Sequence, residues 1–322
     1  WANAFQTLVF MALGLVTFLV LANRIGGGET LLESLQNASS RVSEKFTTRT
    51  EMSSTKFFTY LLIPLSVGMF PHLFQHWLTA KSAASFKLPV VMHPIFIMIV
   101  WVPCVLIGIW ATTQNIPPSI EPNKILAFLV NKETSQMAGG AVLAGLLAAG
   151  ILAAIMSSLD SQFLCLGSMF TNDIVTHYLG RERFSDASQI WIARSFIVVI
   201  VAITYALAMQ DYRSVFTLGV WCFSGFAALF PLVFAALYWR RLTAAGAVSG
   251  ILAAAGSWFY LFRDSGYGAN EEYGIKLPIE GNHEIMPVVA IILCTIISMV
   301  ATSMLTKPPS AATVLKFFPN QS

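Results

Sequence analysis

Eight stretches of this chain are each long and apolar enough to cross a lipid bilayer. A helix needs roughly 20 apolar residues to span the hydrocarbon core, and in most of these stretches no charged side chain interrupts the run. The amphipathic helices of a water-soluble protein would show a polar face every few residues. The pattern therefore predicts an all-α integral membrane protein with about eight transmembrane helices, near residues 4–23, 57–78, 91–112, 139–175, 189–209, 214–239, 243–262 and 286–306.

Composition supports the same class. Only 11% of the 322 residues are charged, against about 25% in soluble domains, so the lipid bilayer must act as the solvent. No basic cluster with interleaved aromatic residues suggests a nucleic-acid partner, and the four cysteines show neither a disulfide framework nor zinc-ligand spacing. We expect a multi-pass protein of the cell membrane, with residues 1–322 forming a single transporter domain and no separate soluble domain. The oligomeric state cannot be read from the sequence.

Charge in the connecting loops predicts the orientation. Lysine and arginine are denser in the loops that follow the second, fourth, sixth and eighth spans, which places those loops in the cytoplasm. The connections 24–56, 113–136 and 263–284 then lie on the outer side, and residues 125–130 could form a short surface helix there.

The second span, residues 57–78, contains Pro64, Gly68 and Pro71 within eight residues. A proline inside a helix removes a backbone donor and clashes with the preceding turn. Irregular backbone at membrane depth is tolerated only where it faces protein or a water-filled cavity, and broken helices build the solute sites of secondary transporters. Five residues between the two prolines are the candidate solute-binding residues, although an ordinary proline kink is the alternative. They are Leu65, Ser66, Val67, Gly68 and Met69.

The fourth span carries small residues along one face and a single charge, Asp160, between residues 137 and 172. Ser157 and Ser158 lie near its middle, with Ala154 one turn earlier. Hydroxyl and carbonyl oxygens are hard ligands that suit a sodium ion, but membrane serines also commonly bond back to the carbonyl four residues earlier. An intramembrane carboxylate such as Asp160 is a functional candidate by default, and it could equally hold a neighbouring helix.

Several motifs of this sequence resemble the sodium/solute symporter family, in the expected order along the chain. The run Ala153-Ala154-Ile155-Met156-Ser157-Ser158-Leu159-Asp160-Ser161, continuing to Phe170-Thr171-Asn172-Asp173-Ile174, closely resembles the family's diagnostic helix. The other matching stretches are residues 1–6, which look like the start of the helix opening the second repeat, 75–82 after the broken helix, and 239–247.

This resemblance implies a five-plus-five inverted-repeat fold that works by alternating access. It implies that sodium is bound by the carbonyl of Ala154 and the hydroxyls of Ser157 and Ser158. The rest of that site would belong to a broken helix of the first repeat, so we expect the chain to be a fragment that lacks the N-terminal helices and does not transport alone. Asn3 stands where several sugar carriers of the family have an acid, and the Pro71-His72 pair looks more like members that carry amino acids and carboxylates than like sugar carriers.

The expected function is therefore sodium-coupled symport of a small organic solute, with an amino acid or carboxylate favoured over a sugar. Two alternatives keep the same fold: a transporter-like sensor domain and a proton-coupled carrier. An enzyme would need a metal cluster or an acid–base pair converging on a cavity, and the sequence indicates neither.

Overall fold

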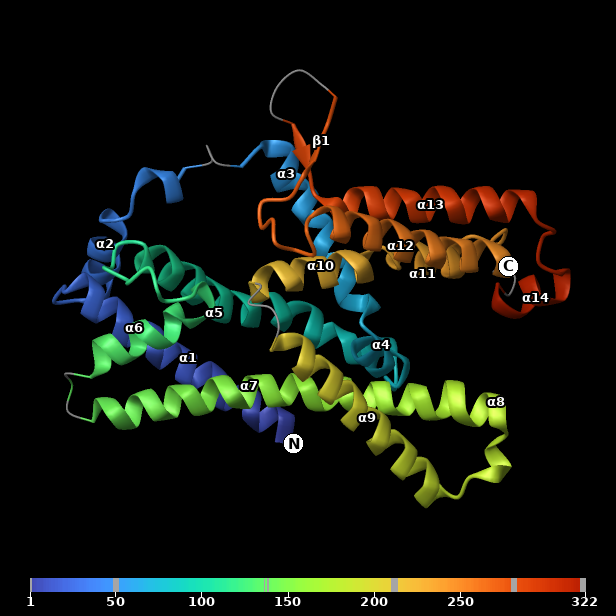
Figure 1. Ribbon diagram of the computed structural model, residues 1–322, viewed down its shortest axis with the longest axis horizontal. Helices are drawn as coiled ribbons and strands as arrows, with labels where there is room; N and C mark the ends of the chain where they lie inside the picture. The colour runs from blue at the N-terminus through green and yellow to red at the C-terminus, as the bar shows by residue number, and fades with distance from the viewer. Residues whose placement is uncertain are drawn as a thin grey trace. The chain divides into compact units, whose positions relative to one another are not determined.

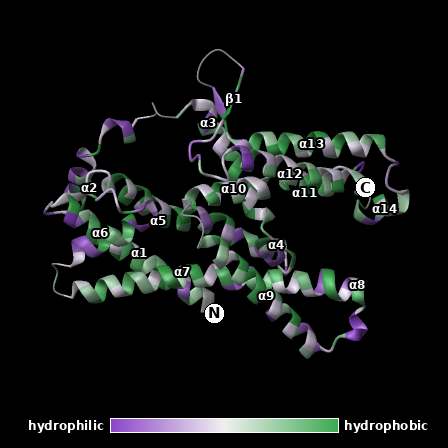
Figure 2. Cartoon of the chain, viewed as in Figure 1, coloured by the Kyte–Doolittle hydropathy of each residue, from purple (hydrophilic) through white to green (hydrophobic). Residues whose placement is uncertain are grey.

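The structure is a computed structural model that describes residues 2–48, 52–135, 137, 139–209, 214–278 and 283–318. Within these ranges seven helices are long and apolar enough to cross a membrane, or eight when one bent pair is counted as a span. The prediction of an all-α membrane protein is confirmed, and hydrophobic residues cover most of the long helices (Figure 2). The chain divides into two compact units: residues 1–49 and 75–208 form unit 1, and residues 50–74 and 209–322 form unit 2. The prediction of a single transporter domain stays a prediction.

Unit 1 contains four of the long helices. Helices α1 and α7 lie side by side, with α5 against α1 and α9 against α7 (Figure 1). The described elements are α1 (Ala2–Gly26), α2 (Leu31–Ser40), η1 (Glu44–Phe46), η3 (Ala83–Phe86), α5 (Lys87–Ala111), η4 (Pro122–Lys124), α6 (Ile125–Thr134), α7 (Gly140–Met169), η5 (Phe170–Thr176), α8 (His177–Leu179), η6 (Arg181–Arg183) and α9 (Asp186–Ala208).

The buried core of unit 1 lies where the C-terminal half of α1 meets α2, α6 and the end of α5. Trp110 is fully buried there, stacks on Phe18 with ring centroids 5.6 Å apart, and donates its indole N–H to Ser39 Oγ at 3.2 Å. Elsewhere the spans expose apolar side chains, and none of the most apolar part of α9 is buried. Exposed apolar surface of this extent suits a bilayer rather than water.

Unit 2 contains the remaining spans and a short hairpin. Its elements are α3 (Ser54–Thr59), η2 (Tyr60–Met69), α10 (Val215–Ala227), α11 (Phe230–Tyr238), α12 (Ala244–Asp264), β1 (Ile275–Lys276), β2 (Glu284–Ile285), α13 (Pro287–Leu305) and α14 (Ala311–Phe317). Helix α4 (Pro71–Leu78) follows η2 and crosses the boundary between the units.

Helices α12 and α13 approach each other closely because small residues face the contact. A Cβ on Gly246 would overlap Ser303 Oγ, and one on Gly250 would lie 3.2 Å from the Met299 Cβ. Ser249 and Ser298 add reciprocal hydrogen bonds to each other's carbonyl, at 3.1 and 3.2 Å. Close backbone approach through small residues and hydroxyl bonds is the packing expected between helices in lipid.

The second span is broken, as its prolines predicted. Residues 60–69 form a 3-10 helix rather than an α-helix, although runs longer than 3–4 residues are uncommon in that geometry. At Phe70 the backbone turns extended, and the helices on its two sides are bent by 58°. The phenyl ring of Phe70 packs on Phe226 and Phe223 of α10, with centroids 4.6 and 5.4 Å away, which holds the bend in place.

Three features differ from what the sequence suggested or were not foreseen. The fourth span runs from Gly140 to Leu179. It is wound as a π-helix over Phe170–Thr176, which overlaps the end of the family-like motif, and π-helical turns often occur at functional sites. The connection 24–56 contains helix α2, whose N-terminus is capped by Thr30. The connection 263–284 enters an antiparallel hairpin of β1 with β2. The short helix expected at 125–130 is present as α6.

Candidate ion and solute sites

The three predicted sodium ligands lie on two successive turns of α7. Ala154 and Ser157 are half-buried and Ser158 is exposed. Within the described part of the chain, neither Ser157 Oγ nor Ser158 Oγ has a hydrogen-bond partner. Both hydroxyls are therefore available to a ligand.

Other hydroxyls in the spans behave differently. Four of them donate to the carbonyl four residues earlier, at 2.6–2.8 Å: Thr17, Ser224, Ser257 and Thr295. The structure thus does not show the back-bonding alternative for Ser157 and Ser158. Ser195 and Thr204 of α9 also lack a partner among the described residues, and both are exposed, as Ser158 is. An unbonded hydroxyl is therefore not sufficient to define a site.

A second polar group faces the same part of α7. Helix α1 runs antiparallel to α7: Arg24, near its end, bonds to the Glu133 carbonyl shortly before α7 begins, while Leu13 packs against Gly150. Seven residues, two helical turns and about 10.5 Å, separate Leu13 from Gln6 and likewise Gly150 from Ser157. The register therefore sets Gln6 level with Ser157 on the facing side. Gln6 Oε1 is buried and has no hydrogen-bond partner within the described ranges.

The predicted solute-binding stretch lies on η2. Ser66 is only 1% exposed and Gly68 is also buried, Leu65 and Met69 are half-buried, and Val67 is exposed. Leu65 lines an apolar hollow of about 510 Å³ that is shared with α11 and α13. Of these five residues, only Val67 is exposed at the surface of unit 2.

The sequence profile of the sodium:solute symporter family matches residues 1–254 of this chain. The chain belongs to this family. Transport rather than catalysis is the activity that the family implies, and sodium is the coupling ion that it implies. Together with the apolar helices, membership makes the chain part of a multi-pass protein of the cell membrane.

Three curated relatives that this chain resembles are all named sodium/proline symporter. The sodium/proline symporter of Haemophilus influenzae is 28% identical over 266 residues, which cover 79% of this chain and 51% of the relative. The sodium/proline symporter of Staphylococcus aureus is 33% identical over 185 residues, covering 55% of this chain and 34% of the relative. That of Salmonella typhimurium is 30% identical over 190 residues, covering 56% and 37%. The chain spans about half the length of these relatives, or less.

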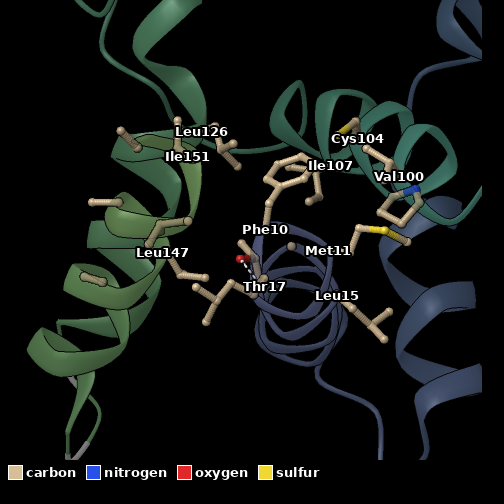
Figure 3. A pocket seen from close by; sticks show the side chains of 18 of the residues that line it. Phe10, Met11, Leu15, Thr17, Val100, Cys104, Ile107, Leu126, Leu147 and Ile151 are labelled. Atoms are coloured by element: carbon tan, nitrogen blue, oxygen red, sulfur yellow. Dashed lines mark hydrogen bonds between the residues drawn. The ribbon is translucent and has the colours of Figure 1, made fainter. Parts of the chain in front are cut away.

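An apolar cavity of about 260 Å³ lies in unit 1 between α1, α5, α6 and α7, with Phe10 projecting into it (Figure 3). Its lining is almost entirely hydrocarbon, and the hydroxyl of Thr17 is engaged by the Leu13 carbonyl at 2.7 Å. A polar solute or an ion would find few ligands there. We therefore do not assign it to the symport chemistry.

Asp160 lies on α7 one residue after Leu159 and is exposed. Its carboxylate has no ion pair or hydrogen bond with any described residue, so its role as an ion ligand or a helix contact stays a prediction. The sodium candidates belong to unit 1 and the solute candidates to unit 2, and each set is assigned within its own unit.

Sequence reasoning missed Gln6 as a site residue. The available signal was an amide side chain near the start of the first apolar stretch, residues 4–23, because polar side chains in membrane helices usually face a partner or the interior of the helix bundle. Its position opposite Ser157 depends on the packing of α1 against α7, which the one-dimensional pattern does not contain.

Proposed function

We propose that the protein containing this chain is a sodium-coupled symporter for a small organic solute, with proline as the first candidate. The observation that carries the proposal is the pair of unbonded hydroxyls on α7, level with the buried amide oxygen of Gln6. A bare sodium ion requires several hard oxygen ligands. Ser157, Ser158, the Ala154 carbonyl and Gln6 would supply oxygens from two neighbouring helices.

The solute would bind along η2, at Leu65–Met69. The 3-10 geometry and the bend at Phe70 support this assignment, because irregular backbone at membrane depth is retained where it lines a site. The choice of an amino acid rests on the relatives named sodium/proline symporters, and a small carboxylate is the next class to test. Binding of ion and solute would be reciprocal, since each must raise the affinity for the other by the same factor.

The test is uptake by the complete protein in proteoliposomes. Radiolabelled L-proline, other amino acids and small carboxylates are offered under an inward sodium gradient, and the same gradients of potassium, choline and protons serve as comparisons. We expect concentrative uptake in sodium that stops when an ionophore collapses the gradient. Uptake driven equally well by a proton gradient would replace sodium with protons. If no offered solute accumulates and sodium does not stabilise the purified protein, a sensor role becomes the better proposal.

A further inference from the structure

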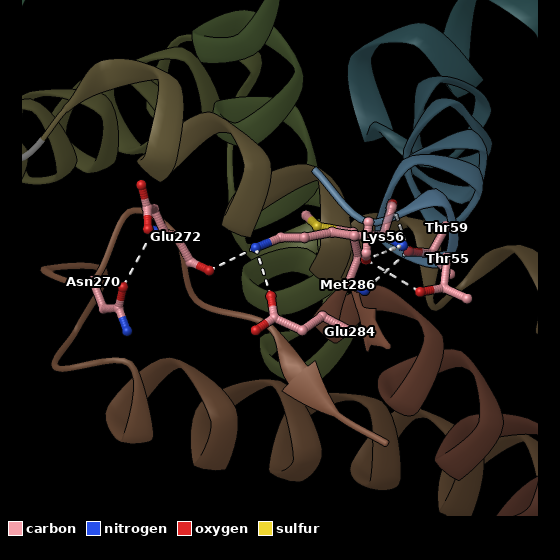
Figure 4. Close-up of polar contacts among 8 residues, drawn as sticks. Thr55, Lys56, Thr59, Asn270, Glu272, Glu284 and Met286 are labelled. Carbon is pink, nitrogen blue, oxygen red and sulfur yellow. Dashed lines mark hydrogen bonds and ion pairs between the residues drawn. The ribbon is translucent and has the colours of Figure 1, made fainter. Parts of the chain in front are cut away.

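The first turns of the broken span are fixed to the loop that precedes α13. Lys56 of α3 donates from Nζ to the Glu272 carbonyl at 2.6 Å and forms an ion pair with Glu284 Oε2 at 3.3 Å (Figure 4). One turn further, Thr59 Oγ1 accepts a hydrogen bond from the Met286 N–H at 3.0 Å (Figure 4). Two contacts one helical turn apart fix the direction of a helix as well as its position.

The ion pair is largely withdrawn from water. The side chains of Lys56 and Glu284 are 13% and 21% exposed. Gly274 lies against both of them, because a Cβ at this position would be 3.0 Å from Glu284 Oε2 and 3.3 Å from Lys56 Nζ. The loop is therefore folded closely around the pair. A pair in this setting is screened less by salt than one in open solvent, and removal of one partner leaves the other charge poorly compensated.

What the pair holds is the solute-binding helix itself. Helix α3 ends at Thr59 and η2 begins at Tyr60 without interruption. Tyr60, Ile63 and Leu65 then pack against a buried cluster that includes Met286 and the first turns of α13. The far end of η2 is the bend at Phe70. A small rotation of α3 would therefore be carried along η2 to Leu65–Met69.

We infer that Lys56 is a positioning residue for solute binding: through Glu284 and Glu272 it sets the orientation of η2. This inference rests on the proposed function, since it takes η2 as the solute-binding helix. The candidate sodium ligands on α7 belong to unit 1, whereas Lys56, Glu272 and Glu284 belong to unit 2. We expect sodium binding measured without solute to be independent of the ion pair. Loss of the pair changes KM for the solute and leaves Vmax and the sodium response close to wild type.

The experiment measures two quantities on the complete protein in each variant: KM and Vmax for sodium-driven uptake of L-proline, and the sodium-dependent rise in melting temperature without solute. We expect Lys56→Met and Glu284→Gln each to raise KM about tenfold while Vmax stays within twofold. Lys56→Arg keeps donors for both the carboxylate and the carbonyl and should keep KM within threefold. The control is Lys124→Met, which removes an exposed ion pair with Glu121 and should leave KM unchanged.

Each of these measurements can support or overturn the positioning role of Lys56. An unchanged KM in Glu284→Gln, the milder variant, overturns the inference. The inference is also overturned if Lys56→Met and Glu284→Gln both lose uptake and also lose the sodium-dependent rise in melting temperature, because that pattern marks a purely structural role. Failure of Lys56→Arg to restore KM also contradicts it. If wild-type protein shows neither sodium-driven uptake nor a sodium response, the proposed function fails, and the inference falls with it.

Discussion

Removing the hydroxyls of Ser157 and Ser158 should separate an ion ligand from a structural serine. The matched control is Ser257→Ala, because Ser257 lies in another span and donates to the Ala253 carbonyl at 2.6 Å. That bond contributes about 0.5–1.5 kcal/mol to folding, and its loss should be the same in sodium and in choline. Ser157 and Ser158 have no such bond to lose, and alanine is the better helix former. In choline, Ser157→Ala and Ser158→Ala should therefore be as stable as wild type or slightly more stable.

Sodium should reverse this order. An ion that binds only the folded protein stabilises it by RT ln(1 + [L]/Kd), about 2.7 kcal/mol at a hundredfold excess over Kd. We assign each hydroxyl about 1.4 kcal/mol, near the low end of the range for hydrogen bonds to charged groups, which weakens sodium binding about tenfold. At the same sodium concentration the stabilisation then falls to about 1.4 kcal/mol in either single variant and about 0.4 kcal/mol in the double variant.

The assay is unfolding of the purified complete protein in sodium and in choline at equal ionic strength. The quantity compared is the difference between the two salts, so that general effects on folding cancel. A sodium-linked stabilisation of wild-type size in the double variant would refute the assignment of these serines. An equal loss of stability in both salts, as expected for Ser257→Ala, would make them structural residues instead.

Two further predictions concern the helix packing of unit 2 and the loop that precedes its hairpin. Gly246→Ala should lower the free energy of unfolding by about 1–3 kcal/mol, since its Cβ would overlap Ser303 Oγ, whereas Gly256→Ala, with no neighbouring atom within 4 Å, should raise it by about 0.5–1 kcal/mol; thermal unfolding of both variants, and partial rescue of the first by Ser303→Ala, check this. Burial and the 2.7 Å hydrogen bond to Asp264 raise the pKa of Tyr273 to about 12 from an ordinary value of 10.0. The folded protein therefore holds this proton more tightly, and the stabilisation, complete below pH 10, is lost between pH 10 and pH 12. Tyr273→Phe should remove that part of the alkaline loss in unfolding experiments over this range, and an unchanged profile would contradict the argument.

The spans could be predicted because one physical requirement outweighs all others. A segment in lipid must be apolar over its whole length, so a run of consecutive apolar residues is enough to identify it. The break in the second span was predictable because Pro64, Gly68 and Pro71 fall within eight residues, and a proline in a helix interior removes a backbone donor and clashes with the preceding turn. The family-like motif on α7 indicated Ala154, Ser157 and Ser158 as sodium ligands. Sodium binding by these residues stays a prediction, which the unfolding experiments in sodium and choline test.

What the sequence did not reveal depends on contacts between distant segments. Lys56 and Glu284 are 228 residues apart in the chain, and nothing near either residue indicates the other. The hairpin of β1 with β2 is too short to leave a periodic signal. The position of Gln6 opposite Ser157 follows from the fit of Leu13 against Gly150, which is a property of two packed surfaces and not of either helix alone.

Gln6 offers the sharpest contrast between stability and function, because the two should change in opposite directions. A buried carbonyl-type oxygen without a partner costs about 1–3 kcal/mol, and Gln6 Oε1 is such an atom among the described residues. Gln6→Met keeps the length of the side chain and removes that oxygen, so in choline the variant should be more stable than wild type. If the oxygen binds sodium opposite Ser157, the same variant should lose part of the sodium-linked stabilisation, about 1.4 kcal/mol for a tenfold weaker Kd. A variant that is stabilised equally in both salts would show that Gln6 lies outside the sodium site, and one that is destabilised in choline would show that its oxygen already has a partner in the complete protein.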